Sequence, residues 1–348
     1  MEKMRAAVLG AGSWGTVLAA LLADNGFAVT IYARNPSVAE EINRRRTNAK
    51  YLPEFHLPDG VRATTSLEEA VSDREMIVVA VPSHSVREVA RSAAPHLCGR
   101  PLVVHATKGF EPDTLKRISE VLAEEFPAFL TDRIAVLSGP SHAEEVARRS
   151  PTAVVVSSKS RETAEAVQSH LINSYFRVYT NPDLIGVEIG GALKNIIALG
   201  AGLSDGLGFG DNAKAALMTR GLAEIARLGM AMGARPITFA GLAGVGDLVV
   251  TCTSRHSRNW RAGYMLSQGQ ALEDVLREMG MVVEGVKTTR AAHRLAQSYG
   301  VEMPITAELY AVLFDGKDPS RAVEDLMGRG KTHEMEEIVE GWLNVLGE

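Results

Sequence analysis

A glycine-rich turn near the N-terminus constrains the fold of this chain more than any other feature of the sequence. The apolar run at 5–9 enters Gly10-Ala-Gly-Ser-Trp-Gly15, and the residues after it predict a helix and then an alternating strand at 27–32. In this context the first glycine permits a tight turn, the second lets a pyrophosphate approach the backbone, and the third lets the helix pack on the strand. The start of the helix also offers free N–H groups to phosphates. We therefore expect Gly10, Gly12 and Gly15 to form a dinucleotide-binding turn.

The end of the second predicted strand bears on the type of nucleotide. NAD-selective units usually place an acidic residue about 20 residues after the glycine turn, where it binds the ribose 2′-hydroxyl. Here the strand is followed by Ala33-Arg34-Asn35, and the first carboxylate is Glu40. Arg34 can pair with a 2′-phosphate, so we expect NADP(H) or NAD(H), with NADP(H) preferred. The alternative is that Arg34 is a solvated loop residue.

Further apolar runs predict that the N-terminal half is a doubly wound parallel sheet of the Rossmann type. They lie at 76–81, 102–106 and 133–137, and two more strands are expected at 152–157 and 176–179, with a helix near 161–171 between them. Ligands bind outside the carboxyl ends of such strands. One edge of the sheet is therefore expected to collect the glycine turn, Arg34, Pro82, Lys108 and residues 139–141.

Two segments at that edge are candidates for substrate contacts. Lys108 follows a predicted buried strand and can hold an anionic substrate or polarise a carbonyl, although a surface lysine is the alternative. The short polar segment Ser138-Gly-Pro-Ser141 can present N–H groups to a substrate, or can be a plain turn. His142 has no partner at a metal-ligand spacing, and we expect no metal site.

Helical patterns dominate after residue 181, so we place a domain boundary there: an α/β domain at 1–181 and a mostly α-helical domain at 182–348. The helix predicted at 186–202 contains five glycines, each costing about 1 kcal/mol relative to alanine. Such a helix is expected to pack very close to another backbone. Lys194 lies within it between apolar neighbours. Burial lowers the pKa of a lysine and makes it available as a base; the alternative is a structural lysine whose charged end reaches solvent.

A second glycine turn precedes Asp247, and a basic segment follows it at 252–259. Together they suggest an anion site, in which Arg258 could hold a phosphate through two parallel hydrogen bonds. Arg255 and Arg261 are alternatives for that role. Another short glycine turn contains Glu284, which is either a cofactor contact or a solvated helix start.

The charge balance excludes some classes of partner. Lys and Arg number 37 against 42 Asp and Glu, which gives a net charge of -5 and no broad positive field for nucleic acid or an anionic membrane. Two cysteines form no ligand cluster, which favours a reducing cytoplasm. The uncharged stretch 6–23 contains the first glycine turn, so we expect no stable membrane insertion. Apolar helical faces permit a homodimer.

Several motifs together resemble the bacterial NAD(P)-dependent glycerol-3-phosphate dehydrogenases. They occur in family order: GAGSWGT at 10–16, ATKG at 106–109, SGPSHAEEV at 138–146, GGALKNIIALGAG at 190–202, GLAGVGDLVVTC at 241–252, SRN at 257–259 and VEG at 283–285. The resemblance implies interconversion of sn-glycerol 3-phosphate and dihydroxyacetone phosphate, which supplies glycerol phosphate for phospholipid synthesis.

The resemblance also implies roles for individual residues. Lys194 matches the catalytic proton acceptor. Beside it we expect Asp247 and Asn195 to orient the lysine or the substrate, and the individual roles of Asn195, Thr251 and Asp247 stay open. The matching cofactor positions are Ser13, Trp14, Arg34, Lys108, Ala143, Arg258, Val282 and Glu284. The matching substrate positions are Lys108, Gly139, Ser141, Lys194, Asp247, Ser257, Arg258 and Asn259.

Two other functions fit parts of the same pattern. A two-domain β-hydroxyacid or ketopantoate reductase would act on a carboxylate rather than a phosphate ester, and would not need the Arg258 region. A nicotinamide-sensing module would bind NADPH but would need neither Lys194 nor Lys108.

Overall fold

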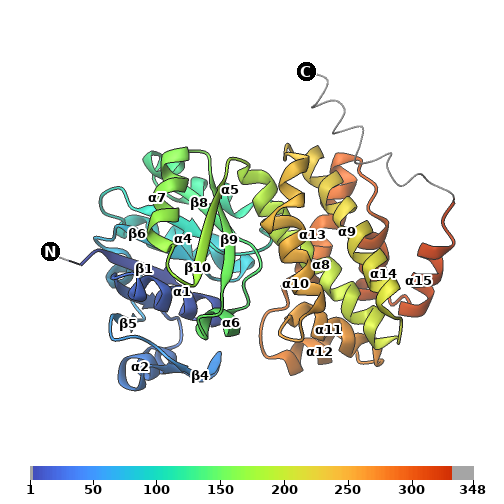
Figure 1. Cartoon of the computed structure of the whole chain (residues 1–348), viewed down its shortest axis with the longest axis horizontal. Coiled ribbons are helices and arrows are strands. Elements are labelled where there is room, and N and C mark those ends of the chain that lie inside the picture. Colours follow the sequence, from blue (N-terminus) through green and yellow to red (C-terminus); the bar gives the residue numbers. More distant parts are fainter. Residues whose placement is uncertain (1–2, 331–348) are drawn as a thin grey trace. The chain divides into compact units, whose positions relative to one another are not determined.

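The structure, a computed structural model, describes residues 3–330 as two compact units. Within these residues, the first unit comprises 3–111 and 116–184, and the second comprises 112–115 and 185–330. The first unit thus ends at Leu184, compared with the boundary expected after residue 181. Both units are coloured along the sequence in Figure 1.

Within residues 3–330, the first unit is built on an eight-stranded sheet with the order β10-β9-β8-β7-β6-β1-β2-β5. Its strands are β1 (Arg5–Leu9), β2 (Ala28–Tyr32), β5 (Val61–Thr64), β6 (Met76–Val79), β7 (Leu102–His105), β8 (Ile134–Ser138), β9 (Thr152–Ser158) and β10 (Phe176–Asn181). From β1 the chain winds outward through β2 and β5, and then returns to place β6 on the other side of β1. The strand order therefore reverses between β1 and β6, where doubly wound sheets bind ligands.

One pair of strands departs from the predicted parallel sheet. β9 pairs with β8 in antiparallel register, whereas the other neighbouring pairs of this sheet are parallel. The connection from β8 to β9 contains the helix α6 (Ala143–Ala147). Its five residues rise about 7.5 Å, and five strand residues span about 16 Å. This helix is shorter than the strand, and the antiparallel register shows that the chain turns back at the edge where β8 ends instead of crossing over.

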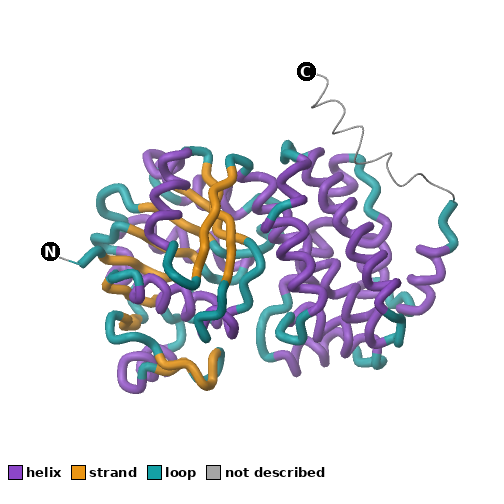
Figure 2. Tube along the Cα trace, in the orientation of Figure 1, coloured by secondary structure: helices purple, strands orange, loops and turns teal. Residues whose placement is uncertain are grey.

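Helices cover both faces of the sheet (Figure 2). Ala6 and Val8 of β1 belong to one apolar cluster and Ala7 and Leu9 to another, so this central strand is buried on both faces. The helices of the unit are α1 (Ser13–Asp24), α2 (Pro36–Arg45), α3 (Leu67–Val71), α4 (Val86–Ala93), α5 (Ile118–Glu125), α6 and α7 (Arg161–Leu171). A two-stranded hairpin follows α2 and consists of β3 (Thr47–Asn48) and β4 (Leu52–His56).

The second unit is helical in the part that the structure describes (Figure 2). Its helices are α8 (Leu184–Gly206), α9 (Asp211–Ala231), α10 (Asp247–Thr253), α11 (Arg258–Ser267), α12 (Leu272–Met279), α13 (Glu284–Tyr299), α14 (Pro304–Phe314) and α15 (Pro319–Met327). Within residues 3–330, α8 is the one helix long and apolar enough to cross a membrane by length and composition, and 94% of its apolar window is buried inside the protein.

The glycines of α8 permit the close backbone packing that the sequence predicts. A Cβ atom on Gly190 would lie 2.4 Å from the carbonyl oxygen of Ala243, in the turn Leu242–Gly246. A Cβ atom on Gly202 would lie 1.9 Å from the carbonyl oxygen of Trp260 on α11. The expectation of a close-packed glycine helix is confirmed, and the packing brings α8 against the elements that flank Asp247 and Arg258.

Candidate active site

The glycine turn of the first unit joins β1 directly to α1. Gly10 has a φ of 118°, and a Cβ atom there would lie 2.6 Å from the carbonyl oxygen of Ala80, after β6. A Cβ atom on Gly15 would lie 2.0 Å from the carbonyl oxygen of Gly10. A Cβ atom on Gly12, the N-cap of α1, would meet no atom within 4 Å. The first and third glycines therefore serve close packing, whereas Gly12 leaves open space at a helix start, which suits a phosphate.

Ser13, Trp14 and Ala143 are three further predicted cofactor contacts of the first unit, and each lies in a different environment. Ser13 begins α1, and its hydroxyl donates to the carbonyl oxygen of Tyr51 at 3.0 Å. Trp14 is half-buried and packs against the apolar cluster that contains Ala6 and Val8. Ala143 is buried at the start of α6.

The loop after β2 carries an arginine on the surface. Arg34 is exposed, and the side chain of Asn35 accepts a hydrogen bond from Ser37 N at 3.0 Å, which caps α2. Glu40, the first acidic residue after the strand, pairs with Arg44 at 2.8 Å. The loop after β2 therefore carries an exposed positive charge close to the end of that strand.

Lys108, Gly139 and Ser141 are brought together at the carboxyl ends of β7 and β8. The ammonium of Lys108 donates to the carbonyl oxygen of Gly139 at 3.4 Å, and the Ser141 hydroxyl donates to the same oxygen at 2.9 Å. Gly139 has a φ of 125°, which favours glycine at this turn. β6, β7 and β8 are parallel, so these residues share one sheet edge with Ala80, which touches the glycine turn.

In the second unit, Lys194 of α8 lies against α10. Its ammonium contacts the carboxylate of Asp247 and donates to the hydroxyl of Thr251 at 2.7 Å. That hydroxyl in turn donates to the backbone carbonyl of Asp247 at 2.5 Å. The three side chains are buried. The positive charge of Lys194 is balanced by the negative charge of Asp247 within the same unit.

Thr251 is a contact of Lys194 whose role the sequence leaves open. It stands four residues after Asp247, so a helix over this segment would have placed both on one face. Cys252 follows on the same helix, where burial raises the pKa of its thiol to about 12. Burial thus disfavours the thiolate form of Cys252.

A second buried network links three helices beside Lys194. Asn259 Nδ2 of α11 donates to Asn195 Oδ1 of α8 at 2.8 Å, and Gly285 N of α13 donates to Asn259 Oδ1 at 2.8 Å. A Cβ atom on Gly285 would lie 2.7 Å from the carbonyl oxygen of Asn195. Asn259 therefore joins the starts of α11 and α13 to the helix that carries Lys194.

The remaining candidates lie at those two helix starts. Ser257 is buried, and its side chain caps α11 by accepting from Trp260 N at 3.2 Å. Arg258 is exposed at the first position of α11, and Arg255 and Arg261 are exposed nearby. Glu284 begins α13, half-buried like Val282 before it. Glu284 precedes Gly285 at the start of α13, and Arg258 precedes Asn259 at the start of α11. Because Gly285 and Asn259 are hydrogen-bonded, these two helix starts adjoin.

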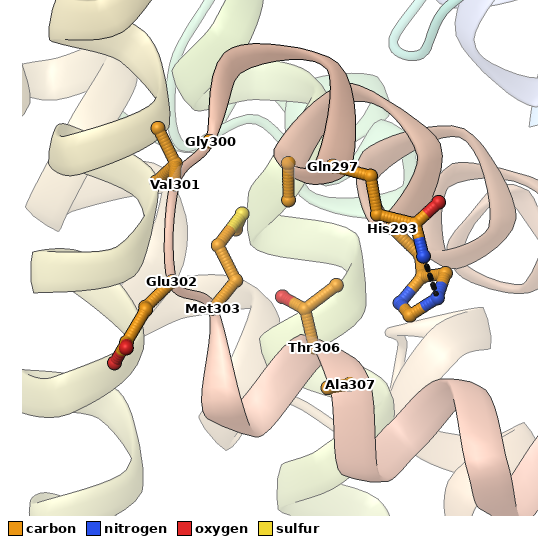
Figure 3. Close-up of a pocket in the computed structure, with 9 residues that line it drawn as sticks. His293, Gln297, Gly300, Val301, Glu302, Met303, Thr306 and Ala307 are labelled. Atoms are coloured by element: carbon orange, nitrogen blue, oxygen red, sulfur yellow. Dashed lines mark hydrogen bonds between the residues drawn. The ribbon is translucent and has the colours of Figure 1, made fainter.

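No group of three or more His, Cys, Asp or Glu side chains within residues 3–330 is arranged to hold a metal ion. A cavity of about 230 Å³ lies between the end of α13 and the start of α14 (Figure 3). Its lining includes His293, Gln297, Met303 and Thr306 and none of the residues predicted for the site.

Comparison with known proteins assigns both parts of the chain to one family. Residues 5–164 match the N-terminal domain of NAD-dependent glycerol-3-phosphate dehydrogenase, and residues 183–324 match its C-terminal domain. The glycerol-3-phosphate dehydrogenase (NAD(P)+) of Bacillus subtilis is 60% identical over 97% of this chain and 98% of its own length. That of Geobacillus thermodenitrificans is 60% identical over 95% of this chain and 97% of its own length.

Solved structures agree with this assignment. A glycerol-3-phosphate dehydrogenase from Coxiella burnetii is 39% identical, with a TM-score of 0.89 over 94% of this chain and 99% of that one. A ketopantoate reductase from Ralstonia eutropha is 16% identical, with a TM-score of 0.58 over 94% of this chain and 100% of that one, a likeness of fold alone. The chain belongs to the NAD-dependent glycerol-3-phosphate dehydrogenase family of NAD(P)-dependent oxidoreductases.

Proposed function

We propose that this chain reduces dihydroxyacetone phosphate to sn-glycerol 3-phosphate, and catalyses the reverse oxidation, as the names of its relatives indicate. The product would feed glycerophospholipid synthesis. The observation that carries the proposal is the buried contact of Lys194 with Asp247 and Thr251, in a chain whose other unit carries a dinucleotide-type glycine turn.

We assign cofactor binding to residues 1–181 and most substrate binding to residues 182–348. The turn residues Gly10, Gly12, Ser13, Trp14 and Gly15 would hold the pyrophosphate region, and Arg34 would favour NADP(H) over NAD(H). The other proposed cofactor contacts are Lys108, Ala143, Arg258, Val282 and Glu284. When bound, the nicotinamide supplies or accepts the hydride, and the protein supplies placement and charge.

Lys194 is the proposed general acid and base. Its Nζ would take the proton of the C2 hydroxyl when glycerol 3-phosphate is oxidised and would return it when the ketone is reduced. The carboxylate of Asp247 would balance the positive charge that Nζ gains when it takes the proton, and the Thr251 hydroxyl, at 2.7 Å, would orient Nζ. The side-chain amide of Asn195, the next residue on α8, would help to orient the lysine or the substrate.

The proposed substrate contacts divide by the part of the substrate they meet. Arg258, with Ser257 and Asn259 at the start of α11, would hold the phosphate, and a guanidinium suits a phosphate because it donates two parallel hydrogen bonds. Lys108 would polarise the C2 oxygen, beside Gly139 and Ser141. Fixing the phosphate determines which carbon meets the hydride.

We further propose that the chain works in the cytoplasm without membrane insertion, on a small-molecule substrate and without nucleic acid. The burial of α8 supports this, because the one helix with a membrane-like composition in the described part of the chain is covered by protein. A homodimer is compatible with the apolar helical faces.

The test is oxidation of NADPH and of NADH by the purified protein with dihydroxyacetone phosphate, followed by the absorbance of the reduced nicotinamide. We expect turnover with dihydroxyacetone phosphate and little with dihydroxyacetone or ketopantoate. Turnover with ketopantoate alone would assign the chain to reduction of the ketone of a keto acid. Binding of NADPH without oxidation by any of the three ketones would indicate a sensing module.

A further inference from the structure

Asn48 is a polar side chain buried beside the glycine turn. It lies on the β3–β4 hairpin and is 1% exposed, whereas the next two residues, Ala49 and Lys50, are exposed. A buried amide requires hydrogen-bond partners. Those of Asn48 come from the glycine turn and the helix that follows it.

The amide nitrogen of Asn48 bridges two points of that turn. Nδ2 donates to the carbonyl oxygen of Ala11 at 2.9 Å and to the hydroxyl of Thr16 at 2.8 Å. An amide nitrogen carries two hydrogens, so both are used. A single atom, Asn48 Nδ2, therefore fixes the glycine turn to the first helical turn of α1.

The bond to Ala11 also sets the direction of an N–H group. Ala11 and Gly12 share a planar trans peptide, in which the C=O and the N–H point in opposite directions. Holding the Ala11 oxygen toward Asn48 therefore turns the Gly12 N–H away from the hairpin. Gly12 has open space in front of it, and the first N–H groups of a helix lack carbonyl partners within the helix.

The hairpin is itself anchored, so it can act as a support. Glu41 Oε1 of α2 accepts hydrogen bonds from Thr47 Oγ1 at 2.7 Å and from Ala49 N at 2.8 Å, on either side of Asn48. The Ser13 hydroxyl donates to Tyr51 O at 3.0 Å, which adds a second tie to the turn. α2 begins directly after Arg34 and Asn35. The hairpin thus links the loop after β2 to the glycine turn.

We propose that Asn48 is a positioning residue for the nucleotide: it holds the glycine turn in the orientation that binds the pyrophosphate. The inference rests on the proposed function. Its Oδ1 is buried and has no hydrogen-bond partner within residues 3–330, which is unfavourable for folding. Retaining an amide at such a position is expected where its donors serve a function.

Asn48→Asp tests this most directly, because aspartate has the same shape but as a carboxylate donates no hydrogen bond. We expect calorimetric binding of NADPH and of ADP-ribose, which both contain the pyrophosphate, to weaken about tenfold or more. Binding of 2′-AMP, which lacks it, should change little. With saturating NADPH, kcat should stay within about twofold while the KM for NADPH rises.

Asn43→Asp is the matched control. Asn43 also bonds to backbone, with Nδ2 donating to Ala63 O and Oδ1 accepting from Ala63 N, both at 2.8 Å, but at the edge strand β5. This variant should keep wild-type nucleotide affinity. If Asn48→Asp does not fold, Asn48→Ser, which retains one donor, should give a smaller loss in the same direction.

Equal nucleotide affinities in the wild type and the Asn48 variants would overturn the inference. So would a loss of kcat with an unchanged KM for NADPH. A wild-type protein that binds neither NADPH nor ADP-ribose would refute the proposed function itself, which separates that failure from a failure of the Asn48 assignment.

Discussion

The ammonium of Lys194 and the carboxylate of Asp247 form an ion pair in which only 7% and 1% of the two side chains are exposed. Buried ion pairs contribute little net stability, because desolvation offsets much of the attraction between the charges. Removing one partner is costly, however, because it leaves the other charge buried alone. The pair is therefore best understood as a way to hold an amine in a defined place.

Replacing that amine should abolish most of the activity. We expect Lys194→Ala to lower kcat by about a thousandfold, the range of general acid–base catalysis, while the Kd for NADPH stays near the wild-type value. Steady-state kinetics and calorimetry measure the two. Because Asp247 would lose its partner, Lys194→Ala/Asp247→Asn should recover thermal stability without recovering kcat. Near-normal turnover in either variant would remove Lys194 from its role.

Arg34 should decide the choice of nucleotide. Arg34→Asp places a carboxylate where NAD-selective proteins bind the ribose hydroxyl, so the ratio of kcat/KM for NADPH to that for NADH should fall about tenfold or more. Arg45→Asp, an exposed arginine of α2, is the control with the same change in net charge. If the ratio of kcat/KM for NADPH to that for NADH falls equally in both variants, the effect comes from the change in net charge and not from a contact between Arg34 and the nucleotide.

Arg258 should act on the phosphate of the substrate. We expect Arg258→Ala to raise the KM for dihydroxyacetone phosphate about a hundredfold, within the loss expected for a charged hydrogen bond. Because Arg258 is also a proposed cofactor contact, the comparison is made at saturating NADPH, where any slow turnover of dihydroxyacetone should stay unchanged. Arg255→Ala and Arg261→Ala are the comparisons, since both arginines are exposed nearby. If one of them gives the larger effect, the phosphate ligand is that arginine.

Gly190 should be intolerant of a side chain. Alanine normally favours a helix interior by about 1 kcal/mol over glycine, but here its Cβ would lie 2.4 Å from the backbone oxygen of Ala243. We expect Gly190→Ala to lower the free energy of unfolding by about 1–3 kcal/mol and to reduce kcat, since the displaced turn leads into Asp247. Gly200→Ala is the control on the same helix, because its Cβ would meet only leucine methyl groups, at 3.3 Å or more. Denaturant unfolding that gives equal losses would contradict the packing argument.

Glu224 should make stability depend on pH. Burial raises the pKa of this carboxyl to about 7, against the hydrogen bonds it accepts from Ile305 and Thr306 at the start of α14. Because the pKa is higher in the folded chain than in the unfolded one, this group's contribution to stability is greatest below pH 4.5 and falls as the pH rises to about 7.

Glu224→Gln is neutral throughout that range. The Tm of the wild type, measured relative to that of the variant, should therefore decrease between about pH 5 and pH 7.5. A difference in Tm that stays constant over this range would show that Glu224 does not titrate there.

Much of the sheet could be predicted because its central strands are apolar runs bounded by glycine and polar turns. β5 was missed because it is a four-residue strand with an arginine at its second position, where the apolar pattern is weak. The antiparallel pairing of β8 with β9 was also missed, since the alternation of side chains carries no strand direction.

The two halves of the candidate site differed in how far the sequence could define them. The glycine turn is contiguous, so its geometry follows from residue spacing. The contact between Lys194 and Asp247 joins residues 53 apart, and the direction of each side chain depends on how α8 packs against α10. Asn48 gave no signal, because one asparagine in a hairpin does not reveal which backbone it holds.

The glycines of α8 have a consequence for how this enzyme can fail. The helix that carries the proposed catalytic base is also the one against which the Leu242–Gly246 turn and α11 are packed backbone to backbone. If α8 separates from these elements, the proposed base loses its position and the second unit loses its central packing at the same time. Heat inactivation and cooperative unfolding of that unit should therefore occur together. The activity that remains after mild heating should come from a fraction of fully active, folded molecules and not from a population of partly active ones.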